Sequence, residues 1–404
     1  MKFVVVGPAL SGNKGAAAML ESIVQTLTKK YPDASFTLLS HYPKADAKLN
    51  PYKNLQIVKA KPLYLGMVIN SLALLYFILP PLRPLLRKEP AIKAIAEADA
   101  VLDAPGITFN DGREVFLLFN VATILPALFM RRPVIKCAQA VGPFKNRLNR
   151  LCARIFLPKM KVIVARGDYT FNNLQTLGLK NVVHGADYAF ALEIEPEHIK
   201  QAVQYLKNSV FKDTGKIVGV TPSTVVKKRF DEAGQDYAKT MVDFIDWLVS
   251  QGYKVAILPH SIRNSTKPHN NDGPLCQTIF EGLAHKDNCY YLDEEIDSQT
   301  LRYIIGKCDL MVTSRFHGMI AGLSMGVPTL VIGWSHKYGE VLKMFELENL
   351  AFDYKNMTDK SLQSAFGNMY KNESAIHQKI AKNLPAVKKL AIKHIYIIDK
   401  AIET

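Results

Sequence analysis

Short apolar runs rich in β-branched residues alternate with helical stretches through two regions of the chain. In the first region the pattern predicts a helix over 15–29 and strands at 2–7, 35–39, 100–103, 133–138 and 162–165. In the second region it predicts helices near 236–251, 298–307, 317–325 and 337–345, and strands at 216–221, 254–258, 310–313 and 329–332. Such alternation is typical of parallel sheets covered by helices. We therefore expect an α/β fold with two Rossmann-like domains that face each other across a cleft.

The two regions also give the expected domain boundaries. An N-terminal Rossmann-like domain is predicted over residues 1–195 and a C-terminal one over 210–375. Residues 376–404 contain apolar positions at helical spacing among many lysines, which predicts a C-terminal helix that packs across the domains.

One apolar segment breaks the alternation. Residues 62–82 carry no charge and are followed by a basic stretch up to residue 88. Their length lies at the edge of the transmembrane range of about 17–25 residues. A span here would separate the first strand from the rest of its sheet, so none is predicted. Two alternatives stay open for the insertion 62–88: a buried or oligomer-covered helix, or a helix that contacts anionic lipid headgroups. Residues 115–130 are predicted as a core helix.

Composition narrows the function classes. Of the 404 residues, 48% are hydrophobic and 22% are charged, which excludes a disordered, collagen-like or polytopic membrane chain. Lysine and arginine exceed aspartate and glutamate by 51 − 36 = 15, so an anionic partner is expected. The five cysteines are scattered without a CxxC pair, which favours a reducing compartment. The apolar run at 3–6 is too short for a signal peptide, so we expect a cytoplasmic protein.

Polar turns follow several predicted strands, and ligands of such sheets bind at the carboxyl ends of the strands. The turn 12–15 precedes a helix N-terminus, where backbone amides favour an anion. The alternative for each turn is local turn chemistry, with Asn13 capping the helix in the first of them. The candidates for lining the cleft are Asn13, Gly15, Asp103, Gly106, Asp111 and Gln139.

Two basic turns are stronger candidates for chemistry. Arg166 follows the strand 162–165, and Asp168 is predicted to cap a helix over 169–177. Arg315 and His317 lie between a strand and a helix N-terminus, where the helix dipole favours negative charge. A guanidinium binds carboxylate or phosphate in a bidentate manner, and an imidazole beside an anion keeps its proton more readily. The alternatives are a salt-bridged Arg166 and a structural, capping His317.

These residues resemble a known family. The run SRFHG at 314–318, followed by A-x-x-x-x-G-x-P at 321–328 and by WSHK at 334–337, is similar to the C-terminal signature of the polysaccharide pyruvyl transferases. Four further segments match the same family in the same order: GNKGAAA at 12–18, QAVGPF at 139–144, and residues 166–168 and 187–190. Ala16 and the run 103–106 depart from the family pattern, and both lie in the half where the acceptor is expected to bind.

The resemblance implies a glycosyltransferase-B-like architecture and a transferase that moves the pyruvyl group of phosphoenolpyruvate onto a sugar as a ketal. It implies that His317 is the general acid, that Arg166 and Arg315 hold phosphoenolpyruvate, and that Lys337 lies near the same pocket. The acceptor would be a sugar of a cell-surface polysaccharide or of its lipid-linked precursor at the inner face of the plasma membrane. No cofactor and no nucleic acid are implied, and no metal is expected because arginines neutralise the anion.

Two other functions stay open. A nucleotide-sugar-dependent glycosyltransferase would have the same architecture, and Glu340 and Glu348 match the Glu-x7-Glu spacing of retaining glycosyltransferases. In those enzymes the pair precedes the G-x-P turn, whereas here it follows Pro328. A noncatalytic protein that binds anionic polymers would suit the net charge of +15 and the basic tail at 379–400.

Overall fold

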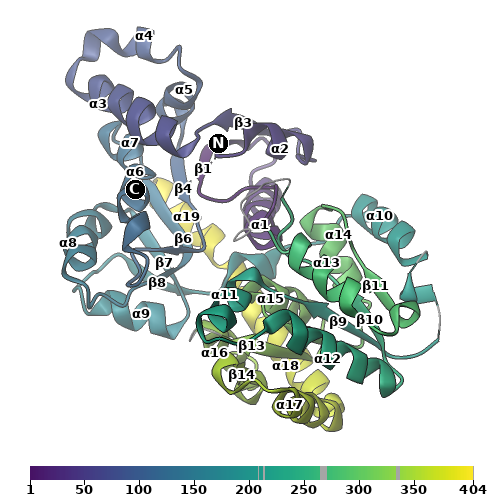
Figure 1. The fold of residues 1–404 in the computed structure, drawn as a ribbon. Coiled ribbons are helices and arrows are strands. Elements are labelled where there is room, and N and C mark those ends of the chain that lie inside the picture. Colours follow the sequence, from purple (N-terminus) through teal and green to yellow (C-terminus); the bar gives the residue numbers. More distant parts are fainter. Residues whose placement is uncertain (208, 213, 264–270, 334–336, 404) are drawn as a thin grey trace. The chain divides into compact units, whose positions relative to one another are not determined.

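The computed structural model describes residues 1–403 apart from 208, 213, 264–270 and 334–336 (Figure 1). It divides into two compact units, which are described separately. The first consists of Met1–Leu10, Ala16–Leu192 and Lys388–Thr404, and the second of Ser11–Gly15 and Glu193–Val387. Ser11–Gly15 therefore belong to the second unit, although the segments before and after them in sequence belong to the first.

The first unit is built on a parallel sheet. Its strands lie in the order β3-β2-β1-β4-β6-β7-β8, and β5 pairs with β6. Val4 of β1 pairs with Thr37 on one side and with Val101 on the other. The strand bounds are β1 Lys2–Val6, β2 Ser35–Ser40, β3 Leu55–Lys59, β4 Ala100–Asp103, β5 Ile107–Thr108, β6 Val134–Val141, β7 Val162–Arg166 and β8 Val182–Gly185.

Helices cover both faces of this sheet, because alternate strand residues point to opposite sides. Phe3 and Val5 belong to a core shared with α1 and α19, whereas Val4 and Val6 belong to a core shared with α3 and α5 to α8. The helix bounds are α1 Lys14–Lys30, α2 Pro43–Lys48, α5 Pro90–Glu97, α6 Leu117–Ala122, α7 Leu125–Phe129, α8 Arg147–Phe156, α9 Asp168–Gln175 and α19 His394–Glu403.

The insertion 62–88 is a broken helical hairpin of a π-helix, Tyr64–Ile69, then α3, Asn70–Ile78, a 3-10 turn, Pro80–Leu82, and α4, Arg83–Leu86. Its inner side is buried in the unit and its outer side exposes apolar residues that include Leu63, Met67 and Ile78. Among the described residues, no helix is both long enough and apolar enough to cross a membrane.

The predicted helix over 115–130 is wrong in its continuity. The segment forms a 3-10 turn, Glu114–Phe116, followed by α6 and α7, with Pro126 in the first turn of α7. Proline lacks the N–H that a continuous helix would need there. Leu117 and Val121 are in the core as expected, but Val115 and Leu118 face outward.

The second unit repeats the plan with a six-stranded parallel sheet in the order β11-β10-β9-β12-β13-β14. The strand bounds are β9 Ile217–Thr221, β10 Lys254–Ile257, β11 Cys289–Tyr291, β12 Leu310–Thr313, β13 Thr329–Gly333 and β14 Ala351–Asp353. The helix bounds are α10 Pro196–Lys207, α11 Thr224–Glu232, α12 Tyr237–Ser250, α13 Gly273–Gly282, α14 Ser298–Ile305, α15 Phe316–Ser324, α16 Lys337–Lys343 and α17 Asp359–Lys371. Two such sheets confirm the predicted fold class.

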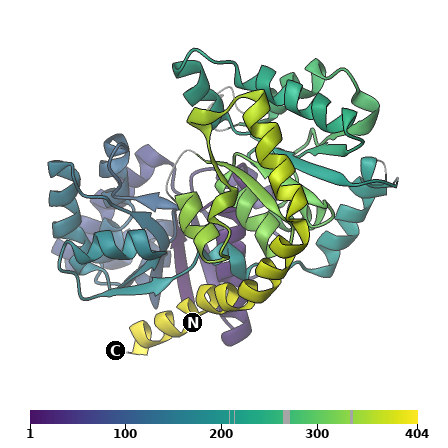
Figure 2. The ribbon, with the colours of Figure 1, turned by 90° about the horizontal axis from the view of Figure 1, so that it is seen from below.

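The end of the chain is helical. α18 spans Glu373–Ile392 with Pro385 inside it, and α19 follows after one residue (Figure 2). The division between the two units falls within α18, after Val387. The predicted tail helix is therefore two helices in succession.

Candidate active site

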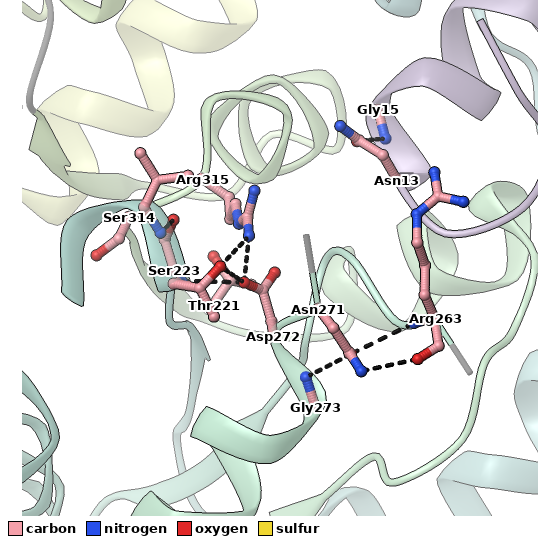
Figure 3. Close-up of polar contacts among 12 residues, drawn as sticks. Asn13, Gly15, Thr221, Ser223, Arg263, Asn271, Asp272, Gly273, Ser314 and Arg315 are labelled. Carbon is pink, nitrogen blue, oxygen red and sulfur yellow. Dashed lines mark hydrogen bonds and ion pairs between the residues drawn. The ribbon is translucent and has the colours of Figure 1, made fainter. Parts of the chain in front are cut away.

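The turn after β12 places Arg315 at the N-cap of α15 (Figure 3). His317 is the second residue of that helix. Thr313 Oγ1 accepts a hydrogen bond from the backbone N–H of Arg315 at 3.0 Å. Tyr237 and Ser314 share a hydroxyl hydrogen bond of 2.8 Å, and Tyr338 donates to the Ser314 carbonyl at 3.2 Å. Because all four partners are buried, the turn is held in one conformation, as a site for positioned chemistry requires.

The Arg315 guanidinium is held from one side by a buried carboxylate. Its Nη2 donates to Asp272 Oδ1 and, at 3.2 Å, to Thr224 Oγ1. Burial is the largest single influence and lowers the pKa of Arg315, but the charge and the hydrogen bond of Asp272, with smaller contributions from Tyr338 and Cys276, together raise it by more, so the net shift is upward and the side chain stays cationic. Its Nε is buried and has no hydrogen-bond partner among the residues that the structure describes. The side chain is 16% exposed, so a ligand can reach it.

His317 lies in the first turn of α15, half-buried against a glycine. A Cβ placed on Gly15 would lie only 2.1 Å from the Cγ and Nδ1 of the His317 ring. Only glycine therefore allows this approach of backbone to imidazole. On its other side the ring meets Phe316 edge-on at 5.1 Å between centroids, and Lys337 Nζ lies 4.8 Å from the Phe316 ring.

The turn that carries Gly15 is hydrogen-bonded to other residues of the second unit. The Lys14 ammonium donates to Glu295 Oε1 at 2.8 Å, and the Lys14 backbone N–H donates to the His260 carbonyl at 3.1 Å. Asn13 Oδ1 accepts from the backbone N–H of Gly15 at 3.0 Å, which confirms its capping role. These bonds place Asn13 and Gly15 beside His317, in the unit that contains the C-terminal signature.

Two basic residues near this turn did not stand out in the sequence. A Cβ on Gly12, whose φ is +74°, would lie 2.2 Å from Arg263 Cζ, so the guanidinium rests on the turn. Burial, followed by the positive charges of His317 and Arg315, lowers the pKa of His260 well below its usual value. His260 is therefore neutral at pH 7, mainly because it is buried. Its position shortly after β10 is the signal that could have found it.

Asp103 and Gln139, both predicted to line the cleft, contact each other toward the carboxyl ends of β4 and β6 in the first unit. Gln139 Nε2 donates to Asp103 Oδ2 at 3.0 Å, and Thr108 Oγ1 donates to Gln139 Oε1 at 2.5 Å. Lys136 forms a fully buried ion pair with Asp103. Asp103 Oδ1 is buried and has no hydrogen-bond partner in the described part of the chain. Lys136 was missed, although a lysine within an apolar strand was a signal.

Arg166 lies at the end of β7, also in the first unit, and is buried. Its Nη1 donates to Asp187 Oδ2 at 3.0 Å, so the salt-bridged alternative is observed. A Cβ on Gly106 would lie 3.8 Å from that same Nη1, which places Gly106 beside the guanidinium. Asp111, by contrast, accepts from the backbone N–H of Lys145 at 2.6 Å and so orders the approach to α8.

The predicted cap at Asp168 is wrong. α9 begins at Asp168 itself, and Gly167, with φ of +98°, occupies the capping position. Glycine tolerates this left-handed conformation, which lets the helix begin one residue earlier than expected. The Asp168 carboxylate is exposed and lies 3.7 Å from His184 Nδ1. In the WSHK motif, Lys337 is the first residue of α16, whereas 334–336 lie outside the described residues.

A group of possible metal ligands lies elsewhere. The donor atoms of Glu195, Glu197 and His198, at the start of α10, come within 4.8 Å of one another. His198 Nδ1, however, lies 3.0 Å from Asp297 Oδ1, and Glu197 is exposed. These residues are more simply explained as an ion-paired helix start than as a metal centre.

Comparisons with known proteins identify the family of the chain and its fold. Residues 13–336 match the family model described as polysaccharide pyruvyl transferase. The chain is 22% identical over 412 residues to the amylovoran biosynthesis protein AmsJ of Erwinia amylovora, covering 95% of both proteins. Among solved structures, a UDP-GlcNAc 2-epimerase from Neisseria meningitidis bound to UDP-GlcNAc superposes with a TM-score of 0.62 at 13% identity, covering 100% of both chains. A glycosyltransferase from Rickettsia africae superposes with a TM-score of 0.55 at 13% identity, covering 100% of this chain and 98% of that one.

The structural likenesses show a shared fold and confirm the glycosyltransferase-B-like architecture. The family model spans most of the chain and includes residues 13–15, Arg166, Arg315 and His317. The chain belongs to the polysaccharide pyruvyl transferase family.

Proposed function

We propose that this protein transfers the pyruvyl group of phosphoenolpyruvate onto a sugar of a polysaccharide or of its lipid-linked precursor, forming a pyruvate ketal and releasing phosphate. The observation that carries the proposal is the pairing of Arg315 and His317 at one helix N-terminus, with the guanidinium fixed by Asp272. Family membership supports the reaction class.

The donor carries a carboxylate and a phosphate on a three-carbon frame. The Arg315 side chain is 16% exposed and Asp272 engages only its Nη2, so the guanidinium can bind one of these groups. The α15 N-terminus and the Lys337 ammonium, which lies over the Phe316 ring, add positive potential. Each charge-assisted hydrogen bond contributes about 1.5–3 kcal/mol. We assign Arg166 to the same anion.

His317 would act as the general acid. It would protonate the methylene carbon of the donor, which makes the central carbon electrophilic. One sugar hydroxyl then bonds to that carbon, and the bond from carbon to the phosphate oxygen breaks as a second hydroxyl closes the ketal. One hydroxyl proton restores the His317 imidazolium, and the other leaves on the released phosphate. A positioned acid typically contributes about 10²–10⁴ in rate.

We assign acceptor binding to polar residues of each unit. Asn13 and Gly15 lie beside His317, and Asp103, Gly106 and Gln139 lie at the carboxyl edge of the first sheet. A lipid-linked acceptor would suit the insertion 62–88, whose exposed apolar side and basic flank we assign to contact with an anionic membrane.

The test is a phosphate-release assay. The protein is incubated with phosphoenolpyruvate and candidate lipid-linked sugars, and parallel reactions supply nucleotide sugars instead. We expect phosphate release with formation of a pyruvylated product, and a loss of at least about 10²-fold in His317→Ala. His285→Ala, at an exposed histidine of the same unit, is the matched control. Turnover of a nucleotide sugar without phosphoenolpyruvate would instead establish a glycosyltransferase.

The arginines are tested through the donor dependence. Arg315→Lys keeps the charge but loses the planar donor set, so we expect a higher KM for phosphoenolpyruvate with a smaller change in kcat. Arg166→Lys should behave in the same way. An increase confined to the KM of the acceptor would contradict both assignments.

A further inference from the structure

The outer side of α8 is apolar where a water-exposed helix should be polar. Leu148, Leu151 and Ile155 are 57%, 56% and 44% exposed. The inner side instead buries Asn149, whose amide donates to Asp111 Oδ1 at 2.8 Å. Amphipathic helices on globular proteins ordinarily turn their apolar stripe inward. The inner side of α8 already packs against the unit. The exposure of Leu148 and Leu151 is therefore not explained by poor packing of this helix on the core.

A second apolar protrusion adjoins this helix. Val115 and Leu118, which flank the start of α6, are 86% and 84% exposed. α6 packs against α8, so the two exposed apolar groups lie on neighbouring helices of the first unit (Figure 1). We call the following residues the α8 surface: Val115, Phe116, Leu118, Leu148, Leu151 and Ile155. Contiguous exposed apolar residues of this kind mark an interaction site.

The charge around the α8 surface is mostly positive. Residues 115–167 contain no aspartate or glutamate, but they contain ten lysines and arginines, of which Lys136 and Arg166 are buried in ion pairs. Arg147 and Arg154 are exposed on α8 itself and have no acidic partner within the described ranges. The nearest acids precede the turn: Asp111 accepts backbone N–H groups at the start of α8, and Glu114 accepts from Gly112. The rim of the surface is therefore cationic and largely uncompensated.

We propose that the α8 surface docks on an anionic lipid bilayer. Leucine and isoleucine side chains would enter the boundary of headgroups and acyl chains, while Arg147 and Arg154 bind headgroup phosphates. A second copy of this chain fits less well, because a two-fold contact would bring two acid-free, arginine-rich surfaces together. The proposal goes beyond the transfer reaction and does not depend on it, since docking needs neither donor nor acceptor.

The experiment is co-sedimentation of the full chain with vesicles. Vesicles of phosphatidylglycerol and phosphatidylcholine are compared with vesicles of phosphatidylcholine alone. We expect binding to the anionic vesicles that weakens with added salt. Arg147→Ala/Arg154→Ala should lower the partition coefficient about 30-fold, at about fivefold for each charge. Leu148→Ser/Leu151→Ser should lower it about 100-fold, because the variant loses two leucine side chains that would be about half inserted into the bilayer.

Matched controls come from the opposite helical layer of the same unit. Tyr396→Ser removes an apolar side chain that is 64% exposed on α19, and Lys389→Ala/Lys393→Ala removes two exposed cations. We expect both controls to bind as the wild type does. Thermal unfolding of every variant verifies that these surface changes leave the fold intact.

Two outcomes would overturn the proposal. If the folded α8 variants bind vesicles as strongly as the wild type does, docking belongs to the insertion 62–88 alone. A dimer in sedimentation velocity that the Leu148→Ser/Leu151→Ser variant abolishes, without vesicle binding by the wild type, would show that a second copy covers the surface.

Discussion

Replacing Gly15 by alanine tests whether the backbone next to His317 controls the position of the imidazole. The added Cβ would lie 2.1 Å from two ring atoms of His317 and 2.5 Å from its Cβ. Ordinary carbon contacts begin near 3.5 Å, so the ring and the turn must separate by more than about 1 Å. Overpacking of this kind destabilises proteins by about 1–3 kcal/mol. Displacement of a catalytic group by about 1 Å can lower the rate about 10²-fold.

We therefore expect Gly15→Ala to fold with a modestly lower melting temperature and to lose about 10²-fold in kcat for phosphate release. Gly367→Ala is the matched control, because Gly367 also lies in a helix but a Cβ there meets no atom within 4 Å. If Gly15→Ala acts through the ring, its effect on kcat should nearly vanish in a His317→Ala background. Wild-type kcat in a folded Gly15→Ala protein would refute the reasoning, as would effects of the two changes that simply add.

Three further changes probe the buried charges. Asp272→Asn removes the charge that anchors Arg315, so the KM for phosphoenolpyruvate should rise more than kcat falls in steady-state assays; an unchanged KM would exclude this anchoring role. Lys136→Met leaves the Asp103 carboxylate buried without a cation and should lower the free energy of unfolding in urea by about 3–5 kcal/mol, whereas a change below about 1 kcal/mol would contradict a tight pair. Burial lowers the pKa of His394 to about 3. Because the unfolded chain binds the proton near pH 6.5, stability is retained above that pH and lost below it, by about 2 kcal/mol at pH 5. His394→Phe, which can keep the stacking on Tyr188, should remove this loss in urea titrations at pH 7 and pH 5, and an unaltered pH dependence would exclude His394 as its source.

The central strands could be predicted because their burial on both faces leaves a continuous apolar run. β4 and β12 were predicted at their observed bounds, Ala100–Asp103 and Leu310–Thr313. The missed strands lie toward the sheet edges, where burial is one-sided and the sequence is short and mixed. β8, for example, reads VVHG, and β14 reads AFD, with exposed first and last residues.

The same contrast holds for the candidate site. Arg315 and His317 could be placed together because they lie two residues apart in sequence, after a recognisable strand. Asp272 could not, because it reaches Arg315 from 43 residues away and nothing local marks the pairing. The packing of Gly15 on His317 was equally hidden, since 302 residues separate them and only tertiary structure brings them together.

That contact limits how the gene can be divided. A fragment that begins at Glu193 would encode all six strands of the second sheet but not Ser11–Gly15. It would lose the glycine that abuts the imidazole and the lysine that pairs with Glu295. Split-gene complementation should consequently succeed only where the amino-terminal fragment supplies those five residues in trans. The recombination points available to evolution or to protein engineers are therefore fewer than the two-sheet layout suggests.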